Sequence, residues 1–168
     1  RRVEEAMARH GAFSAEGAGR VDHWRLGTGE VRETLLAGGV LRDERIGPRD
    51  GVEPSFRLGA AWDAGAAATL RGALYRGWRL PTLNELYRPF RVGLDAVAAN
   101  PALAPERLTG GEVAVSAEPA ANLKLTLTGF AARLDRAIAN VPLAEGPGFF
   151  PGVGFVAAGG QYLQRLNL

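Results

Sequence analysis

The sequence predicts an all-β fold in which antiparallel strands follow one another in up-and-down order. Hydrophobic and polar residues alternate with a period of two in several segments, which indicates strands with one apolar and one polar face. Short turns alternate with long links along the chain. The composition, 46% hydrophobic and 23% charged over 168 residues without cysteine, argues against disorder, disulfide bridges and thiolate metal sites.

The alternation defines about seven candidate strands. We interpret residues 1–8 as the first of them, although a short helix also fits this segment. Residues 13–26 alternate less cleanly than the strands that follow. The candidates after residues 1–8 are 13–26, 52–63, 68–78, 108–118, 123–140 and 161–168.

The phase of the alternation assigns side chains to the two faces of the sheet. The residues expected on the apolar face are Val52, Phe56, Leu58, Leu70, Leu74, Val113 and Val115. The residues expected on the polar face are Glu53, Ser55, Arg57, Thr69, Arg71, Glu112, Ser116, Lys124, Thr126 and Thr128. Arg76 is the exception, because it falls on the apolar face near the end of its strand.

The connections carry a second signal. Short turns are expected at 9–11, 63–66 and 118–122, whereas the links over 29–50, 81–107 and 141–160 are long. In an up-and-down sheet this order places every short turn at one end and every long loop at the other. Gly65 should therefore lie at one end, and the loops with Glu30, Asn84, Tyr87, Pro101 and Phe150 should start from the other.

This asymmetry is typical of transmembrane β-barrels, whose strands also have about the predicted length. The aromatic residues Trp24, Trp62, Trp78 and Tyr162 fall near strand ends, where interfacial girdles lie. The alternative is a soluble β-barrel that binds a small molecule, since amphipathic strands build such folds too. The apolar residues distinguish the two: they line an enclosed core in a soluble barrel and form an open band in a membrane protein.

Other functions find little support in the sequence. Lysine and arginine total 20 against 18 aspartate and glutamate, which is too even a balance to predict a nucleic-acid partner. Two histidines, His10 and His23, leave little for a metal site. The glycine-rich segment 146–154 does not follow a strand and open a helix, so it is not a phosphate cradle. We predict no enzyme activity, catalytic residue, metal or cofactor.

Two loop segments carry recognisable motifs. The first runs from Tyr75 to Tyr87 and reads Tyr-Arg-Gly-Trp-Arg-Leu-Pro-Thr-Leu-Asn-Glu-Leu-Tyr. The second, from Asn100 to Arg107, reads Asn-Pro-Ala-Leu-Ala-Pro-Glu-Arg. Both resemble segments of TonB-dependent outer-membrane receptors, where the first leaves a strand and the second returns to the next. The ending Asp135-Arg136-Ala137-Ile138-Ala139-Asn140 is similar to that family as well.

The resemblance implies a fold and a function. Its fold is a transmembrane barrel of 22 antiparallel strands around a plug domain, and residues 1–168 would be a partial barrel domain without the plug. Its function is import of a ferric siderophore or similar scarce solute through the outer membrane of a Gram-negative bacterium. The partners implied are the solute, the outer-membrane lipid and the TonB complex, which acts through the plug.

The loop after residue 78 is the candidate ligand site. Arginine clusters suit anionic chelates because the guanidinium forms charge-assisted hydrogen bonds. Loop architecture is the competing interpretation of the same motifs. The candidate ligand-binding residues are Arg79, Asn84, Glu85, Tyr87, Arg88 and Arg91.

The chain should form an open sheet and not a closed barrel. Seven strands with the stagger of a wide barrel cannot close, and an odd number would make the closing pair parallel. We expect residues 1–8 and 161–168 to be the two edges of this sheet. Both ends of the chain have the pattern of interior sequence, so we expect a piece of a longer protein.

Overall fold

The computed structural model describes residues 2–34, 38–65 and 68–168. Its ordered elements form two compact units, and the second comprises the segments Arg25–Asp50, Arg79–Glu106 and Asp135–Leu168, which include the terminal residues Arg49, Arg79 and Glu106 of three long strands. The strands of the first unit's sheet are β1 (Arg2–His10), β2 (Phe13–Leu26), β5 (Arg49–Asp63), β6 (Ala68–Arg79), β9 (Glu106–Ala120) and β10 (Leu123–Asp135). The second unit contains β3 (Gly29–Thr34), β4 (Val40–Ile46), α1 (Leu83–Tyr87), β7 (Phe90–Val92), β8 (Asp95–Ala98), β11 (Ile138–Glu145), β12 (Gly148–Phe150), β13 (Gly154–Val156) and β14 (Gln161–Asn167).

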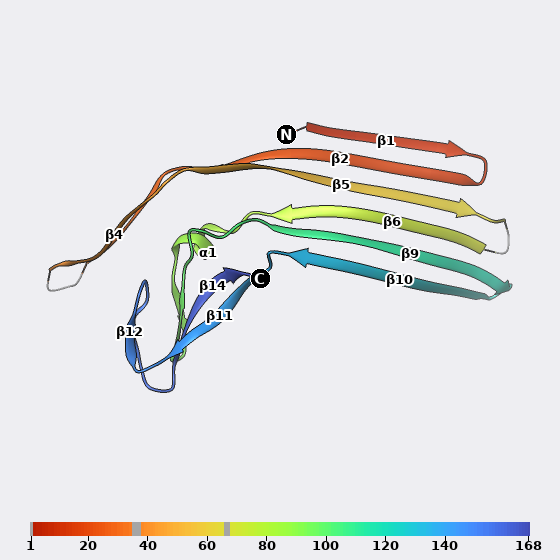
Figure 1. Ribbon diagram of the computed structural model, residues 1–168. Helices are drawn as coiled ribbons and strands as arrows, with labels where there is room; N and C mark the ends of the chain where they lie inside the picture. Colours follow the sequence, from red (N-terminus) through yellow and green to blue (C-terminus); the bar gives the residue numbers. More distant parts are fainter. Residues whose placement is uncertain (1, 35–37, 66–67) are drawn as a thin grey trace. The chain divides into compact units, whose positions relative to one another are not determined.

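The first unit is a six-stranded sheet in the order β1-β2-β5-β6-β9-β10 (Figure 1). Neighbouring strands follow one another along the chain, as the up-and-down prediction requires. Residues 2–8 belong to strand β1, so the helical alternative for them is wrong. Strands β2, β5, β6, β9 and β10 are 12 to 15 residues long, which is enough for a tilted strand to cross a bilayer.

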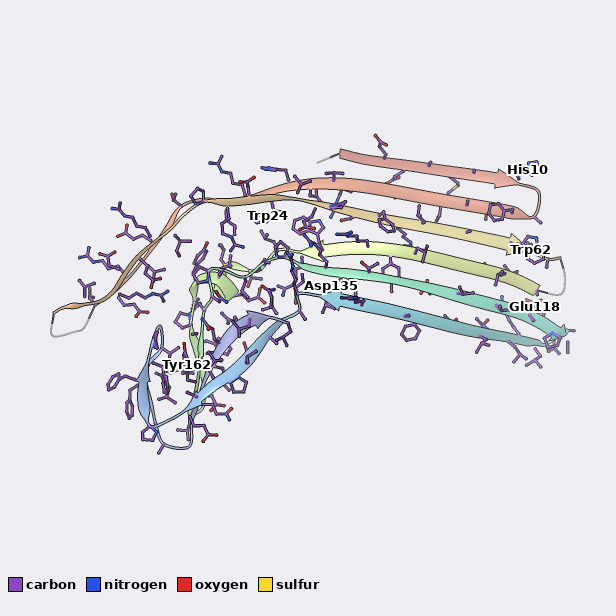
Figure 2. All side chains as sticks on the ribbon, in the orientation of Figure 1. His10, Trp24, Trp62, Glu118, Asp135 and Tyr162 are labelled. Atoms are coloured by element: carbon purple, nitrogen blue, oxygen red, sulfur yellow. The ribbon has the colours of Figure 1, made fainter. Side chains whose placement is uncertain are left out.

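The turns between β1 and β2 and between β9 and β10 lie at one end of the sheet, where β5 also ends and β6 begins (Figure 1). The Asp63 amide donates to the Ala12 carbonyl over 2.8 Å, which ties the β5 turn to the β1–β2 turn. His10, Trp62 and Glu118 lie near this end, and Trp24 lies toward the other (Figure 2). The long connections after β2, β6 and β10 leave from the opposite end, so the predicted separation is confirmed. The predicted turn over 63–66 reaches Ala66, which lies outside the described residues.

The register between β5 and β6 confirms the predicted faces. Phe56 pairs with Arg76, Leu58 with Leu74, and Trp62 with Leu70 on one face. The other face pairs Arg57 with Tyr75 and Asp63 with Thr69. All seven residues predicted for the apolar face are exposed, from 38% for Phe56 to 58% for Leu74. They form an open band and not the enclosed core that the soluble alternative requires.

Aromatic rings cover two glycines on the polar face. A Cβ atom on Gly51 would lie 2.8 Å from the Trp24 ring, and one on Gly110 would lie 2.6 Å from the Tyr75 hydroxyl oxygen. Each aromatic residue belongs to the neighbouring strand, so the missing side chain is what allows the ring to lie flat on the sheet. Trp24 therefore packs on the polar face and does not point outward as a girdle residue would.

Charged side chains gather on the same face near the long connections. Glu53 is only 3% exposed and accepts two hydrogen bonds from Arg107, at 2.8 and 2.5 Å. Asp22 pairs with Arg20 over 2.6 Å and accepts from the Trp78 indole over 3.3 Å. These contacts join strands that are not neighbours, β2 with β6 and β5 with β9.

The sheet is open, as predicted, but one of its edges differs from the prediction. Its edge strands are β1 and β10. Residues 161–167 form β14, which lies between β11 and β8 in a separate four-stranded sheet. The prediction that 161–168 forms an edge was wrong, because an alternation of period two predicts a strand but does not identify its partners, β11 and the distant β8.

The second unit is built around that four-stranded sheet, in the order β11-β14-β8-β7. Strand β14 pairs antiparallel with β11 and parallel with β8. Its core contains Leu86, Ala96, Leu103, Val156 and Tyr162, all buried. Tyr162, expected in an interfacial girdle, is 8% exposed and stacks on Phe150, so that expectation was wrong.

The long links are not irregular loops. The first contains the β3–β4 hairpin, the second contains α1, β7 and β8, and the third contains β11 with the β12–β13 hairpin. The strand expected to end near Asn140 instead ends at Asp135, and Arg136 turns the chain with a φ of 58°. No helix in the described part of the chain is long and apolar enough to cross a membrane.

The contact between Trp24 and Gly51 makes the first prediction. Gly51→Val should destabilise the sheet by about 1–3 kcal/mol, because a side chain there meets the indole ring. Gly19→Val is the matched control, since a Cβ at Gly19 has no neighbour within 4 Å. Urea unfolding of the purified protein, followed by tryptophan fluorescence, measures both; equal midpoints for the two variants would contradict the packing.

Candidate functional site

Helix α1 begins with a capping box formed by residues of the first motif. The Thr82 hydroxyl accepts from the Glu85 amide over 3.2 Å. The Glu85 carboxylate accepts from the Thr82 amide over 2.7 Å and from its hydroxyl over 3.0 Å. These bonds satisfy donors that the start of a helix leaves free. Leu86, on the inner side of this short helix, is fully buried.

Arg79 joins the two motifs. Its guanidinium donates to both Glu85 carboxylate oxygens, at 2.9 and 3.2 Å, and to Glu106 over 2.5 Å. The other Glu106 oxygen accepts from the Ile138 amide over 2.6 Å. We call Arg79, Glu85 and Glu106 the loop clasp, because they connect the ends of β6, α1 and β9 with the start of β11.

The clasp changes the acidity of Glu85. The Arg79 guanidinium is the main cause that lowers the pKa of Glu85 to about 2 from its ordinary value of 4.5. Partial burial opposes this shift, and the two hydrogen bonds from Thr82 add to it. The carboxylate is therefore ionised at neutral pH.

The second motif is held by its asparagine and by Arg49. The Asn100 side chain donates to the Arg165 carbonyl over 2.8 Å and accepts from the Ala102 amide over 2.9 Å. Arg49 donates to the carbonyls of Pro101 and Leu103, at 2.5 and 3.0 Å. Leu103 is 1% exposed, so the motif's apolar residue anchors this segment in the core.

Arg165 is a buried cation that sequence reasoning missed. It is 8% exposed and donates to the carbonyls of Asn84 and Arg88, at 2.5 and 3.0 Å. Its guanidinium also lies 4.8 Å from the centre of the Phe90 ring. Burial lowers the pKa of Arg165, and the charge of Glu85 opposes this only in part. An arginine in an amphipathic strand carries no sequence signal of such a role.

The structure places the predicted ligand residues in different surroundings. Arg79 and Glu85 bind each other in the clasp. Asn84 and Arg88 have exposed side chains, and their carbonyls hold Arg165. Tyr87 is half-buried and lines a groove of about 290 Å³ with Leu26 to Val31, Ile46 and Leu83.

Arg91, the last predicted residue, lines a second groove of about 590 Å³. Its Nη2 atom donates to the carbonyls of Val153 and Phe155, at 2.5 and 2.7 Å. The groove is lined by Glu33, Thr34, Pro89, Phe90, Arg91, Gly152, Val153 and Gly154. Within the described residues, no group of three or more histidine, aspartate or glutamate side chains could hold a metal ion.

Comparison with known proteins gives a family match and a structural match. The model of the TonB-dependent receptor-like β-barrel family matches residues 7–164. The structure is similar to a double mutant of the Serratia marcescens hemophore receptor HasR, in complex with its hemophore HasA and heme. The TM-score is 0.65 at 20% identity, and the match covers 92% of this chain but 27% of the HasR chain. A search of curated proteins found no match.

The lowered pKa of Glu85 makes the clasp sensitive to acid. The ion pair contributes stability above about pH 4.5, and this contribution should be lost as the pH falls toward 2, because the folded state holds its proton less tightly than the unfolded one. Amide exchange of residues 82–88, corrected for intrinsic rates, should show decreasing protection over this range. Glu85→Gln should lower the protection at pH 7 and remove most of its pH dependence.

The exposed Glu112, on the polar face of the sheet, supplies the control Glu112→Gln, which should behave like the unmodified protein. If Glu85→Gln kept the pH dependence of the unmodified protein, another group would be responsible for it.

Proposed function

Because the chain belongs to the TonB-dependent receptor-like β-barrel family, we propose that it forms part of an outer-membrane receptor that imports an iron chelate or a similar scarce solute. The observation that carries this proposal is the single-layer sheet, with one exposed apolar face and long connections at one end. A role in transport and not in catalysis agrees with the family.

The two faces support a position in a bilayer. The exposed band that includes Phe56, Leu58 and Leu74 would contact lipid, because hydrocarbon is the environment in which such a surface costs least. The polar face, with Glu53, Arg57 and Arg71, would face the barrel interior. The edges at β1 and β10 would pair with further strands of the same receptor, since lipid cannot satisfy free backbone groups.

The partners that we propose follow from this position. The TonB complex would supply energy through a plug domain inside the full barrel. The solute would reach the protein from the outside of a Gram-negative cell, on the side of the long connections. A ferric siderophore is the class expected from the arginine-rich loop. Heme is a second candidate, because HasR, whose fold is similar, was solved with heme.

We propose that the exposed side chains among the predicted ligand residues contact the solute, and that the clasp residues shape the loop. Asn84 and Arg88 are exposed while their backbone carbonyls are held by Arg165, and Arg91 is exposed beside the larger groove. Arg79 and Glu85 are bound to each other, which leaves them a supporting role.

Growth tests the transport function. A strain that lacks the full-length gene should lose growth on one iron source from a panel of ferric siderophores and heme, and the intact gene should restore it. Cobalamin uptake is measured in the same strain. Unchanged uptake of every solute in the panel would contradict the proposal.

The orientation of the sheet is tested by two alanines at the same depth. Ala60 lies opposite Gly72 on the apolar face, and Ala73 lies opposite Gly59 on the polar face. Ala60→Arg should cost roughly 2 kcal/mol, within the range for arginine between the interface and the centre of the bilayer. Ala73→Arg should be tolerated. The yield of folded, protease-resistant receptor in outer membranes measures both, and equal yields would argue against a lipid-facing band.

A further inference from the structure

Two acidic side chains lie next to each other on the polar face of the six-stranded sheet. Three contacts define the register between β2 and β5: the Trp24 ring over Gly51, the Glu16 side chain over Gly59, and the Asp63 amide on the Ala12 carbonyl. In this register Asp22 stands directly opposite Glu53. Two carboxylates in opposite positions destabilise a sheet unless other groups compensate them. The compensating groups show what this pair of acids holds.

Each acid is bound by a residue at one end of the second long connection, which joins β6 to β9. Asp22 accepts from the Trp78 indole over 3.3 Å, and Arg20 compensates its charge over 2.6 Å. Glu53 is 3% exposed and accepts from two nitrogens of Arg107, at 2.8 and 2.5 Å. Trp78 is the last residue but one of β6, and Arg107 is the second residue of β9. The two acids therefore hold the points where the chain leaves the sheet and returns to it.

The contact of Trp78 is not a consequence of regular strand geometry. The recorded pairs of β5 and β6 end at Phe56 and Arg76, on the apolar face. Alternation would place Trp78, two residues further on, on that face as well. Its indole instead reaches Asp22 on the polar face. The hydrogen bond to Asp22 thus accompanies a change in the direction of the chain just before the connection begins.

The neighbours of these two residues close the base of the same connection. Arg79, which follows Trp78, donates to Glu106 over 2.5 Å. Glu106 in turn precedes Arg107. Trp78 and Arg107 therefore bind acids of the sheet, and the next residue at each end belongs to the loop clasp. Because peptide bonds join these neighbours, each end of the connection is fixed by two contacts in different directions.

We propose that Asp22 and Glu53 are positioning residues of the receptor. They fix the two ends of the second long connection, which carries the predicted ligand residues, and they do not contact the solute themselves. Without either contact the connection leaves or rejoins the sheet at a different angle, so the solute binds less tightly while the transport step is unchanged. This inference rests on the proposed function and adds residues of the sheet to it.

Uptake of the ferric siderophores and heme of the growth panel by the full-length receptor tests the positioning role. For the solute that is imported, Glu53→Gln should raise the half-saturating concentration about 5- to 50-fold, as for typical coupling between sites, with a maximal rate per folded receptor that stays within about twofold. Glu53→Asp keeps the charge and should restore most of the affinity. Glu112→Gln is the matched control, because Glu112 is an exposed acid of the same face, and it should change neither constant.

The contact with Asp22 is tested by Trp78→Phe, which keeps an aromatic ring and removes the donor. This variant should also raise the half-saturating concentration and leave the maximal rate unchanged. Trp62→Phe is its control, because Trp62 is exposed near the end of the sheet with the short turns and should tolerate the same change (Figure 2).

A double variant separates positioning from folding. Arg107→Gln leaves Glu53 opposite Asp22 without its cation, so it should lower the yield of folded receptor. Combining it with Glu53→Gln removes the uncompensated charge and should recover the yield, whereas the affinity should stay low because the tie is lost. If the affinity recovered together with the yield, the pair would have a structural role alone and the inference would be overturned.

A distance measurement tests the same role without the solute. Nitroxide labels at Val92, exposed in the connection, and at Leu127, exposed on β10, should give a broader distance distribution in Glu53→Gln than in Glu112→Gln. Unchanged affinity and an unchanged distribution in Glu53→Gln would overturn the positioning role and leave the transport function standing. If the deletion strain took up every solute normally, the transport function would fall, and the distance distribution alone would decide whether Glu53 positions the connection.

Discussion

The second unit depends on one recurrent interaction, in which an arginine donates to two backbone carbonyls of a distant segment. Arg49 binds Pro101 and Leu103, Arg91 binds Val153 and Phe155, and Arg165 binds Asn84 and Arg88. Connections of this length leave carbonyls without ladder partners, and a buried carbonyl without a donor is costly. Arg49 uses two guanidinium nitrogens for its two carbonyls, whereas a single nitrogen of Arg91 and of Arg165 donates to both. This use accounts in structural terms for several of the 19 arginines that accompany a single lysine.

The sheet of the first unit follows from local sequence patterns, whereas the second unit depends on contacts between distant segments. This difference decides which features could be predicted from the sequence. Period-two alternation is local, so the strands over 52–63 and 68–78 and their apolar face could be predicted directly, and the β5–β6 register agrees with the prediction. The short turns then order the sheet. The pairing of β14 with β8 joins Tyr162 to Ala96, which are far apart in the sequence, and no local pattern encodes such a partner. For the same reason the burial of Arg165 could not be predicted.

In the candidate site, the charge of a residue alone does not predict whether it is available to an anionic ligand. Arg79, Arg88 and Arg91 look equivalent in the sequence, because each is a cation in the same connection. The structure separates them by their acceptors: Arg79 binds two carboxylates, Arg91 binds neutral carbonyls, and the Arg88 side chain is exposed. A cation that is already neutralised by Glu85 and Glu106 has little attraction left for an anionic ligand, whereas one that is bound to carbonyls keeps its charge. The distinction requires the fold, since it depends on Glu106 and on the β12–β13 hairpin.

The contacts that hold the connections act mainly on the backbone and on the two motifs. Arg165 grips the carbonyls of Asn84 and Arg88 and makes no recorded use of their side chains, and Arg91 grips Val153 and Phe155 in the same way. A substitution at an exposed position such as Thr34 or Arg88 therefore leaves the recorded supports in place. The clasp and the arginine–carbonyl hydrogen bonds hold the backbone of the connections. Exposed side chains such as those of Thr34 and Arg88 take no part in these contacts. Exposed side chains of this kind can therefore be replaced while the recorded contacts that hold the loop backbone stay as they are.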